Sequence, residues 1–150
     1  MTYREYERNL SDNLADLEKR LKEKRYRAKL VKRVFIPKSN GKLRPLGIPT
    51  LEDKIVQYVV REILQTLFVP LFLDCSYAYR PNRSARIVAE KLRDELFGKY
   101  TWIVESDVSG FFDNVSHDWM LKMLERRIND KALIGLIKKW LRAGILHPDG

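Results

Sequence analysis

Two extended runs around Asn40-Gly41 constrain the fold of this chain most strongly. The runs are KLVKRVFIPK and KLRPLGIP, and the first is rich in β-branched residues. Asn-Gly between two such runs is the strongest local signal for a tight β-hairpin, because both turn positions need a positive φ. Pro45 and Pro49 are expected to end the second strand. The tip of this hairpin carries three cations, which are Lys38, Lys42 and Arg44.

Helical periodicity surrounds the hairpin. Apolar residues recur at steps of three or four, which predicts helices at 3–25, 51–68, 84–97, 116–127 and 130–143. Ser84 can cap the third of these helices at its start, and Gly98 can end it. The segment TWIVESD, residues 101–107, indicates a single strand. The sequence therefore predicts an α+β fold that is mostly helical, with one hairpin and one lone strand.

The lone strand needs a partner for its backbone hydrogen bonds. The best candidates are the short extended pieces beside the hairpin, or a segment that this sequence does not include. The last residues, RAGILHPDG, stop in turn chemistry without a closing element. We therefore expect that the sequence is a fragment.

The net charge of +9 is concentrated in one part of the chain. From Lys19 to Arg44, here called the basic window, there are twelve Lys and Arg residues against one acid, Glu23. An excess that continues through a helix, a strand and a turn indicates a polyanion such as nucleic acid or nucleotide phosphate. The helical part alone, LEKRLKEKRYR, is equally consistent with a solvated helix face. The cations of the window that we expect to contact RNA are Lys24, Arg25, Arg27 and Lys29.

The remaining composition excludes several classes of protein. No segment approaches the roughly 20 apolar residues that a membrane span needs, and residues 2–20 lack the apolar core of a signal peptide, so a cytoplasmic protein is expected. The single cysteine, Cys75, allows no internal disulfide and is expected to be a small buried side chain. No Ser-His-Asp or Cys-His arrangement and no glycine-rich phosphate loop is present, which removes hydrolase and P-loop functions.

Asp107 is the best candidate for chemistry. It ends the predicted strand, where a carboxylate can reach a bound metal while the sheet fixes its backbone, and Mg²⁺ prefers oxygen ligands of this kind. A role as a cap or turn residue is equally consistent with the sequence. Asp113 and Asp118 fit caps or solvent-facing positions, and His117 is more consistent with a structural role.

Three motifs occur in order along the chain, and they are IPKSNGKLRPLGIPTLEDKIVQ, SYAYRPNRSA and WIVESDVSGFFDNVSHDWMLKML. Together they resemble the fingers and first palm segment of retron-type reverse transcriptases, above all those encoded by group II introns, the maturases. The N-terminal helix resembles the YxxNLxxNLxxLxxRL segment that precedes the fingers hairpin. The resemblance covers essentially the whole chain and implies fingers at 1–100 and the truncated start of a palm at 101–150.

The resemblance implies a catalytic role for residues of the third motif. Asp107 matches the first catalytic aspartate, which holds Mg²⁺, and the carbonyl of Val108 is a candidate for a second metal ligand. Phe112 matches the aromatic that excludes a 2′-hydroxyl, so the expected monomer is a deoxynucleotide. Core packing is the other interpretation of Phe111 and Phe112, and it is expected for Phe111.

The resemblance also implies binding roles for cations of the first two motifs. Lys38 and Arg44 match the fingers cations that hold the incoming triphosphate, with Lys42 as a third candidate, and these cations are expected to face Asp107 across one nucleotide site. Three residues lie in the loop that runs along the template in this family, namely Arg80, Asn82 and Arg83. Arg80 is equally consistent with a buried structural ion pair.

The implied partners are an RNA template or intron RNA, a DNA or RNA primer, and dNTP, with Mg²⁺ in the complete enzyme and a bacterial cytoplasmic location. The family's YADD strand with two more aspartates does not occur in this sequence. Because one carboxylate cannot hold two metals, the chain alone is expected to be inactive. A palm cut after its first motif would leave a strand edge open and favour a homo-oligomer. Two alternatives stay open: a non-catalytic RNA-binding maturase module that assists intron splicing, or a reverse transcriptase of retron, diversity-generating or CRISPR-associated lineage.

Overall fold

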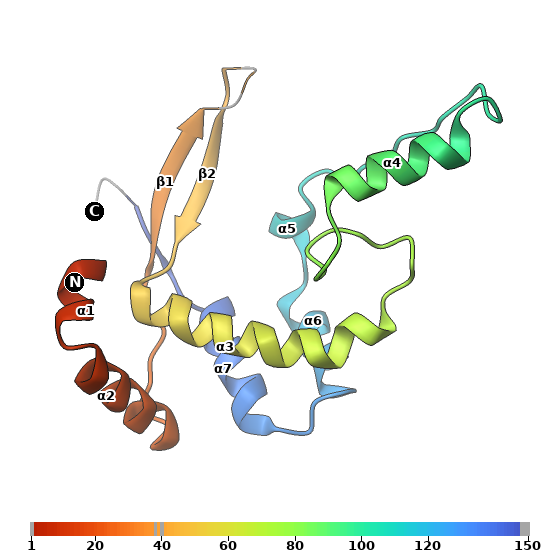
Figure 1. Cartoon of the computed structure of the whole chain (residues 1–150). Coiled ribbons are helices and arrows are strands. Elements are labelled where there is room, and N and C mark those ends of the chain that lie inside the picture. The colour runs from red at the N-terminus through yellow and green to blue at the C-terminus, as the bar shows by residue number, and fades with distance from the viewer. Residues whose placement is uncertain (1, 38, 40, 148–150) are drawn as a thin grey trace. The chain divides into compact units, whose positions relative to one another are not determined.

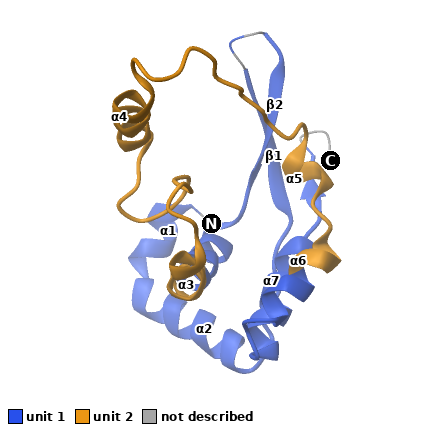
Figure 2. Ribbon diagram, turned by 90° about the vertical axis from the view of Figure 1, so that its right-hand side faces the viewer, with its two compact units in different colours: residues 1–60, 121–150 blue, residues 61–120 orange. Residues whose placement is uncertain are grey.

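The chain forms two compact units, shown in a computed structural model that describes residues 2–37, 39 and 41–147 (Figure 1). The first unit contains residues 1–60 and 121–150, and the second contains residues 61–120 (Figure 2). Helices and a small sheet together confirm the predicted α+β class. The predicted fingers and palm regions meet inside the second unit, and this division into polymerase regions stays a prediction. Among the described residues, no helix is both long and apolar enough to cross a membrane.

The N-terminal part of the first unit is helical but interrupted. Helix α1, Tyr3–Arg8, begins with a capping box between Thr2 and Glu5, and helix α2, Leu10–Lys22, follows after Asn9. The single helix predicted at 3–25 is therefore wrong in its continuity. The break between α1 and α2 coincides with a side-chain hydrogen bond, in which the amide of Asn13 donates to the backbone carbonyl of Tyr6 at 2.8 Å. Asparagine side chains compete with backbone hydrogen bonds in this way.

The predicted hairpin is confirmed. Strands β1, Val31–Pro37, and β2, Leu43–Ile48, pair in antiparallel register, and Gly41 in the connection has φ +77°. The last pair between described residues joins Pro37 and Leu43, and the tight turn at Asn40-Gly41 stays a prediction. Asn40 lies outside the described residues.

The hairpin belongs to a sheet with the strand order β2-β1-β3. Pro45 lies inside β2 opposite Phe35 and does not end that strand. Its missing N–H is tolerated because β2 is an edge strand. Strand β3, Ile145–Leu146, pairs in parallel with the start of β1. The expectation that RAGILHPDG contains no closing element is therefore wrong, since two residues of that segment complete the sheet.

The core of the first unit lies between α2, α3 and α7. Helix α3 comprises Leu51–Phe68 and helix α7 comprises Lys131–Leu141, with Asp130 as the N-cap of α7. Apolar spacing predicted both helices because each has a face to bury. The buried cluster and the half-buried residues packed against it are Leu17, Tyr26 and Val56 with Leu21, Ile55, Leu136 and Trp140.

The second unit has helices but no buried core. It contains the 3₁₀ helix η1, Val69–Leu71, helices α4, Ala85–Leu96, and α5, Phe111–Asn114, and the start of α6, His117–Glu125. The predicted cap is confirmed, because Ser84 accepts from the N–H of Ile87 at 3.3 Å. Gly98 follows the last residues of α4 with φ +73°. None of the side chains of residues 61–120, all of which the structure describes, is buried.

The strand predicted at 101–107 does not form. These residues have no regular secondary structure, and Trp102 is 88% exposed. A strand needs a partner for its backbone groups, and the second unit contains no strand to pair with it. The homo-oligomer was predicted to form through the open edge of this strand. Because the strand does not form, that edge is missing, and the homo-oligomer stays a prediction. Cys75 is exposed in the same unit, so its predicted burial is wrong.

Candidate nucleic-acid interface

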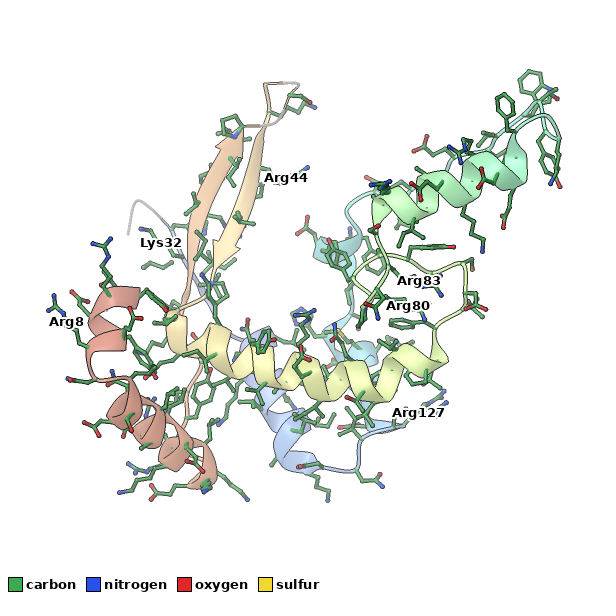
Figure 3. All side chains as sticks on the ribbon, viewed as in Figure 1. Arg8, Lys32, Arg44, Arg80, Arg83 and Arg127 are labelled. Carbon is green, nitrogen blue, oxygen red and sulfur yellow. The ribbon has the colours of Figure 1, made fainter. Side chains whose placement is uncertain are left out.

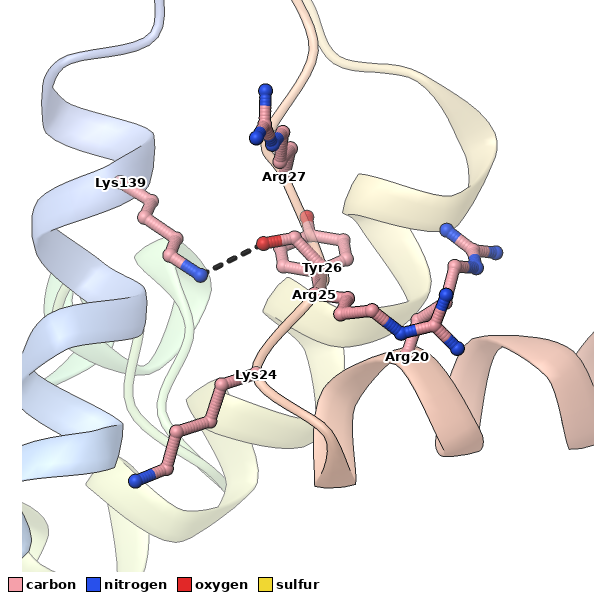
Figure 4. Close-up of a pocket in the computed structure, with 6 residues that line it drawn as sticks. All are labelled: Arg20, Lys24, Arg25, Tyr26, Arg27 and Lys139. Atoms are coloured by element: carbon pink, nitrogen blue, oxygen red, sulfur yellow. Dashed lines mark hydrogen bonds between the residues drawn. The ribbon is translucent and has the colours of Figure 1, made fainter.

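A pocket in the first unit gathers cations from two distant parts of the chain. Its volume is about 600 Å³, and the residues that line it are Arg20, Lys24, Arg25, Tyr26, Arg27 and Lys139 (Figure 4). We call it the cationic pocket. Three of the predicted RNA-binding residues, Lys24, Arg25 and Arg27, come together there, whereas Lys29 lies outside its lining.

The end of α2 shapes the pocket. The backbone N–H groups of Arg25 and Tyr26 both donate to the carbonyl of Arg20, at 2.8 and 2.9 Å. The backbone N–H of Lys24 donates to the carbonyl of Leu21. This is a Schellman ending, which requires a left-handed residue, and Lys24 has φ +58°. Glycine is favoured there, and a residue with a Cβ atom costs about 1 kcal/mol. The chain then turns so that cations flank Tyr26 on both sides.

The floor of the pocket is a hydrogen-bonded tyrosine. Tyr26 is 2% exposed, its hydroxyl donates to Asp53, and it accepts from the indole N–H of Trp140 at 3.0 Å. The second oxygen of Asp53 accepts from the hydroxyl of Thr50 at 2.6 Å and from the backbone N–H of Lys29 at 3.3 Å. Burial, followed by the hydrogen bond to Asp53, raises the pKa of Tyr26, so its hydroxyl stays protonated. These bonds tie the floor to α3 and α7.

Two of the five pocket cations are neutralised by acids. Arg20 binds Glu52 and Asp16, each at 2.7 Å, and the hydrogen bond to Glu52 is the main reason that the pKa of Arg20 is raised. Arg25 donates from Nε to Glu23 at 2.6 Å.

The other three cations of the pocket carry uncompensated charge. Within the part of the chain that the structure describes, Lys24, Arg27 and Lys139 have no carboxylate at ion-pair distance. Lys139 donates to the backbone carbonyl of Tyr26 at 2.7 Å instead (Figure 4). The pocket is therefore positive and rigidly supported.

The hairpin also carries cations, as the sequence predicted. Arg44 is exposed on β2 opposite Ile36 (Figure 3). Lys42 is exposed directly before β2. Lys38, the third predicted triphosphate ligand, lies outside the described residues. The hairpin belongs to the first unit and Asp107 to the second. The nucleotide site predicted between them stays a prediction.

Arg80 organises the loop between η1 and α4. Its guanidinium donates from Nη1 to the carbonyls of Leu73 and Ser76, both at 2.8 Å, and lies 5.4 Å from the ring centre of Phe72 (Figure 3). Arg80 is half-buried and structural, and its partners are backbone carbonyls, so the predicted ion pair is wrong.

The other two residues predicted along the template flank Arg80 differently. Arg83 lies over the ring of Tyr77 at 4.9 Å and 3.5 Å from a carboxylate oxygen of Asp74. Asn82 is exposed with φ +57°. A template contact therefore stays a prediction for Arg80, Asn82 and Arg83.

Asp107 and Val108 are exposed and lie outside any helix or strand. No group of three or more His, Cys, Asp or Glu side chains among residues 2–37, 39 and 41–147 could hold a metal ion. The assignments of Asp107 and Val108 as Mg²⁺ ligands therefore stay predictions, because one carboxylate and one carbonyl supply only part of the oxygen ligands of a hard cation.

The two phenylalanines after Asp107 contact each other. Phe111 and Phe112 meet edge to face with ring centres 5.3 Å apart. Phe111 is 54% exposed, so the prediction that it packs in a core is wrong, because the second unit has no buried core. Phe112 is 83% exposed, and its role as a sugar gate stays a prediction.

Sequence reasoning missed Lys139 and the network beneath Tyr26. Lys139 is one of two lysines at the end of α7, and nothing in the sequence pairs it with Tyr26, which lies 113 positions earlier. Asp53 carried a usable signal. Thr50 precedes it by three positions at the start of α3, which is the spacing of a capping box. The N–H of Asp53 donates to the hydroxyl of Thr50 at 3.4 Å, and that hydroxyl donates to the carboxylate of Asp53 at 2.6 Å.

Comparison with known proteins gives consistent matches. A family model described as reverse transcriptase (RNA-dependent DNA polymerase) matches residues 36–149. Group II intron-encoded protein LtrA of Lactococcus lactis is 41% identical over 128 residues, which are 85% of this chain and 21% of that protein. The putative COX1/OXI3 intron 1 protein of Saccharomyces cerevisiae is 39% identical over 126 residues, 84% of this chain and 15% of that protein. Nuclear intron maturase 1 of Arabidopsis thaliana is 31% identical over 107 residues, 69% of this chain and 15% of that protein. The chain spans about a fifth of the first relative and less of the other two.

Proposed function

The chain belongs to the reverse transcriptase (RNA-dependent DNA polymerase) family, and we propose that the whole protein copies an RNA template into DNA. In this proposal the described residues contribute surfaces for RNA and for the incoming deoxynucleotide. The similar proteins named after introns favour a group II intron protein over the other reverse transcriptase lineages. Its template is then the RNA of its own intron.

The cationic pocket is the observation that supports RNA binding most directly. Phosphate contacts supply most of the sequence-independent affinity of proteins for nucleic acid, and they come from Lys, Arg and backbone N–H groups. Lys24, Arg27 and Lys139 present positive charge that acids of the described chain do not neutralise. The hairpin adds Arg44, which lies on the paired strand β2. Charges of this kind attract a polyanion.

The catalytic part of the proposal concerns the whole protein. Asp107 is proposed as one ligand of Mg²⁺, with further carboxylates supplied from elsewhere in the whole protein. Arg44 and Lys42 are proposed to bind the triphosphate, and Phe112 to contact its sugar. Phosphoryl transfer depends mainly on positioning the reactants and on neutralising their negative charge, and cations and metal ligands can do both. The 150-residue chain by itself is expected to have no polymerase activity.

RNA binding by this chain tests the first part of the proposal. We expect binding that weakens strongly between low and moderate salt, because each phosphate contact releases counterions. The measurement is fluorescence anisotropy with a labelled single-stranded RNA at several salt concentrations. An affinity that does not change with salt would contradict a phosphate-binding surface.

Primer extension by the whole protein tests the second part. Asp107→Asn should abolish DNA synthesis while RNA binding by the same variant persists. In the same assay Phe112→Ala should increase the incorporation of ribonucleotides, because it removes the proposed wall beside the sugar. Unchanged sugar discrimination would refute the gate, and full activity of Asp107→Asn would refute the metal-ligand assignment.

A second candidate function is RNA binding without chemistry, in which this region helps an intron to fold for splicing. The cationic pocket favours it because a phosphate-binding surface needs no metal. Splicing assays separate the two functions. If Asp107→Asn loses DNA synthesis but retains splicing, then the region serves both functions, whereas loss of both would make splicing depend on the polymerase site.

A further inference from the structure

We propose that the cationic pocket holds one phosphodiester group of the RNA backbone, and that Lys139 and Lys24 bind that single group from two elements. This inference rests on the proposed RNA binding and makes it specific. It adds Lys139, which lies far outside the basic window, as a ligand of RNA.

Lys139 is positioned by the floor of the pocket. Its ammonium group donates one hydrogen bond to the carbonyl of Tyr26 at 2.7 Å, and an ammonium group has three donors. Two donors therefore remain for a ligand. The carbonyl that holds Lys139 is that of Tyr26, whose side chain is 2% exposed and bonded to Asp53, so the ammonium is placed before any ligand arrives.

Lys24 occupies a position where lysine is not the favoured residue. Its φ of +58° closes the end of α2, and glycine would adopt this conformation without strain. The side chain is exposed and forms no ion pair with the described acids. Strained backbone positions cluster at active sites and ligand clamps. A phosphate ligand explains why a cation stands at this turn.

The lining of the pocket favours a backbone phosphate over a base. Among the described residues that line the pocket, Tyr26 is the only aromatic one, and its ring is buried, so no base can stack on it. The other five lining residues are all cationic, which suits an anion. The pocket volume of about 600 Å³ lies within the roughly 300–1,000 Å³ of small-ligand sites, so sugars on both sides of a phosphate can be accommodated.

The test compares Lys24→Gly, Lys139→Gln and the double variant in the full chain. We expect each variant to bind a single-stranded RNA more weakly. The slope of log affinity against log salt should fall by no more than about 0.7 in the double variant, the value for one phosphate contact on single strands. Two separate phosphates would lower the slope by about 1.4 and would overturn the single-site assignment.

Two controls separate binding from folding. Lys24→Gly should raise the urea midpoint of unfolding while it weakens RNA binding, which a purely structural residue would not do. Lys138→Gln removes a neighbouring exposed charge on α7 that does not line the pocket, and it should change the affinity less than Lys139→Gln. If the two glutamine variants behave alike, then the pocket inference is wrong while general RNA binding stands. If the unaltered chain binds no RNA, then the proposed function fails as well.

Free phosphate compounds are the other source of the same chemistry. Inorganic phosphate or a nucleoside triphosphate, added at constant ionic strength, should displace RNA equally from the unaltered chain and from the double variant. Saturable binding of inorganic phosphate or the triphosphate by the unaltered chain but not by the double variant, together with equal RNA binding by the two chains, would assign the pocket to a free nucleotide or phosphate ion and would overturn the RNA assignment.

Discussion

Tyr26→Phe is the substitution that tests the architecture of the first unit most directly. It removes only the hydroxyl, which donates to Asp53 and accepts from Trp140 at 3.0 Å. The ring stays in place, so no cavity forms and the change isolates the hydrogen bonds. Asp53 keeps its bonds to Thr50 and to the N–H of Lys29.

The expected loss of stability follows from these contacts. A hydrogen bond to a charged acceptor contributes about 1.5–3 kcal/mol, and a donor left without an acceptor adds about 1 kcal/mol. Tyr26→Phe should therefore lower the free energy of unfolding by about 2.5–4 kcal/mol. This is a large fraction of the roughly 5–15 kcal/mol that stabilises a typical domain.

Urea unfolding followed by circular dichroism measures this change, and the m-value should stay constant. Tyr79→Phe is the matched control, because it makes the same change on a side chain that is 94% exposed and should alter stability by less than about 0.5 kcal/mol. A double-mutant cycle with Asp53→Asn should show a coupling of about 1 kcal/mol or more. A loss below about 0.5 kcal/mol for Tyr26→Phe, or no coupling, would refute the role of this network.

Three further predictions address other parts of the structure. The pKa of Tyr26 in the folded chain is raised from its ordinary value of 10.0, so on a rise in pH the unfolded chain loses this proton before the folded chain does. The free energy of unfolding should therefore fall above pH 10, by up to about 1.4 kcal/mol per pH unit. Urea titrations at several pH values should show a shallower fall for Tyr26→Phe. Gly47→Ala would place a Cβ atom 2.7 Å from Cγ1 of Val31 and should cost about 1–3 kcal/mol in thermal unfolding, most of which Val31→Ala in the same chain should restore. Arg80→Lys removes the planar guanidinium that binds the carbonyls of Leu73 and Ser76. Amide hydrogen exchange at residues 69–83 should therefore accelerate, while the free energy of global unfolding changes by less than about 1 kcal/mol. Unchanged exchange in this segment would contradict the role of Arg80.

Local signals in the sequence were sufficient for much of the fold. The hairpin, the cap at Ser84 and the helices α3 and α7 were predicted because turn chemistry, capping and apolar spacing act over a few residues. The order of three motifs was sufficient for the family, and the match over residues 36–149 confirms it. The same reasoning identified Lys24, Arg25 and Arg27 as a group, since they are neighbours in the chain.

Tertiary structure decided what depends on distant partners. Residues 101–107 have side chains that suit a strand but no strand beside them, so they do not form one. Strand β3 is too short to show alternating apolar residues in the sequence, yet it pairs with β1 in the folded chain. Lys139 joins the cationic pocket because α7 packs where Tyr26 is anchored, 113 positions away. The sequence by itself determined the segments that turn, cap and form helices, whereas backbone pairing and the convergence of charges required the folded chain, because both depend on residues that only packing brings together.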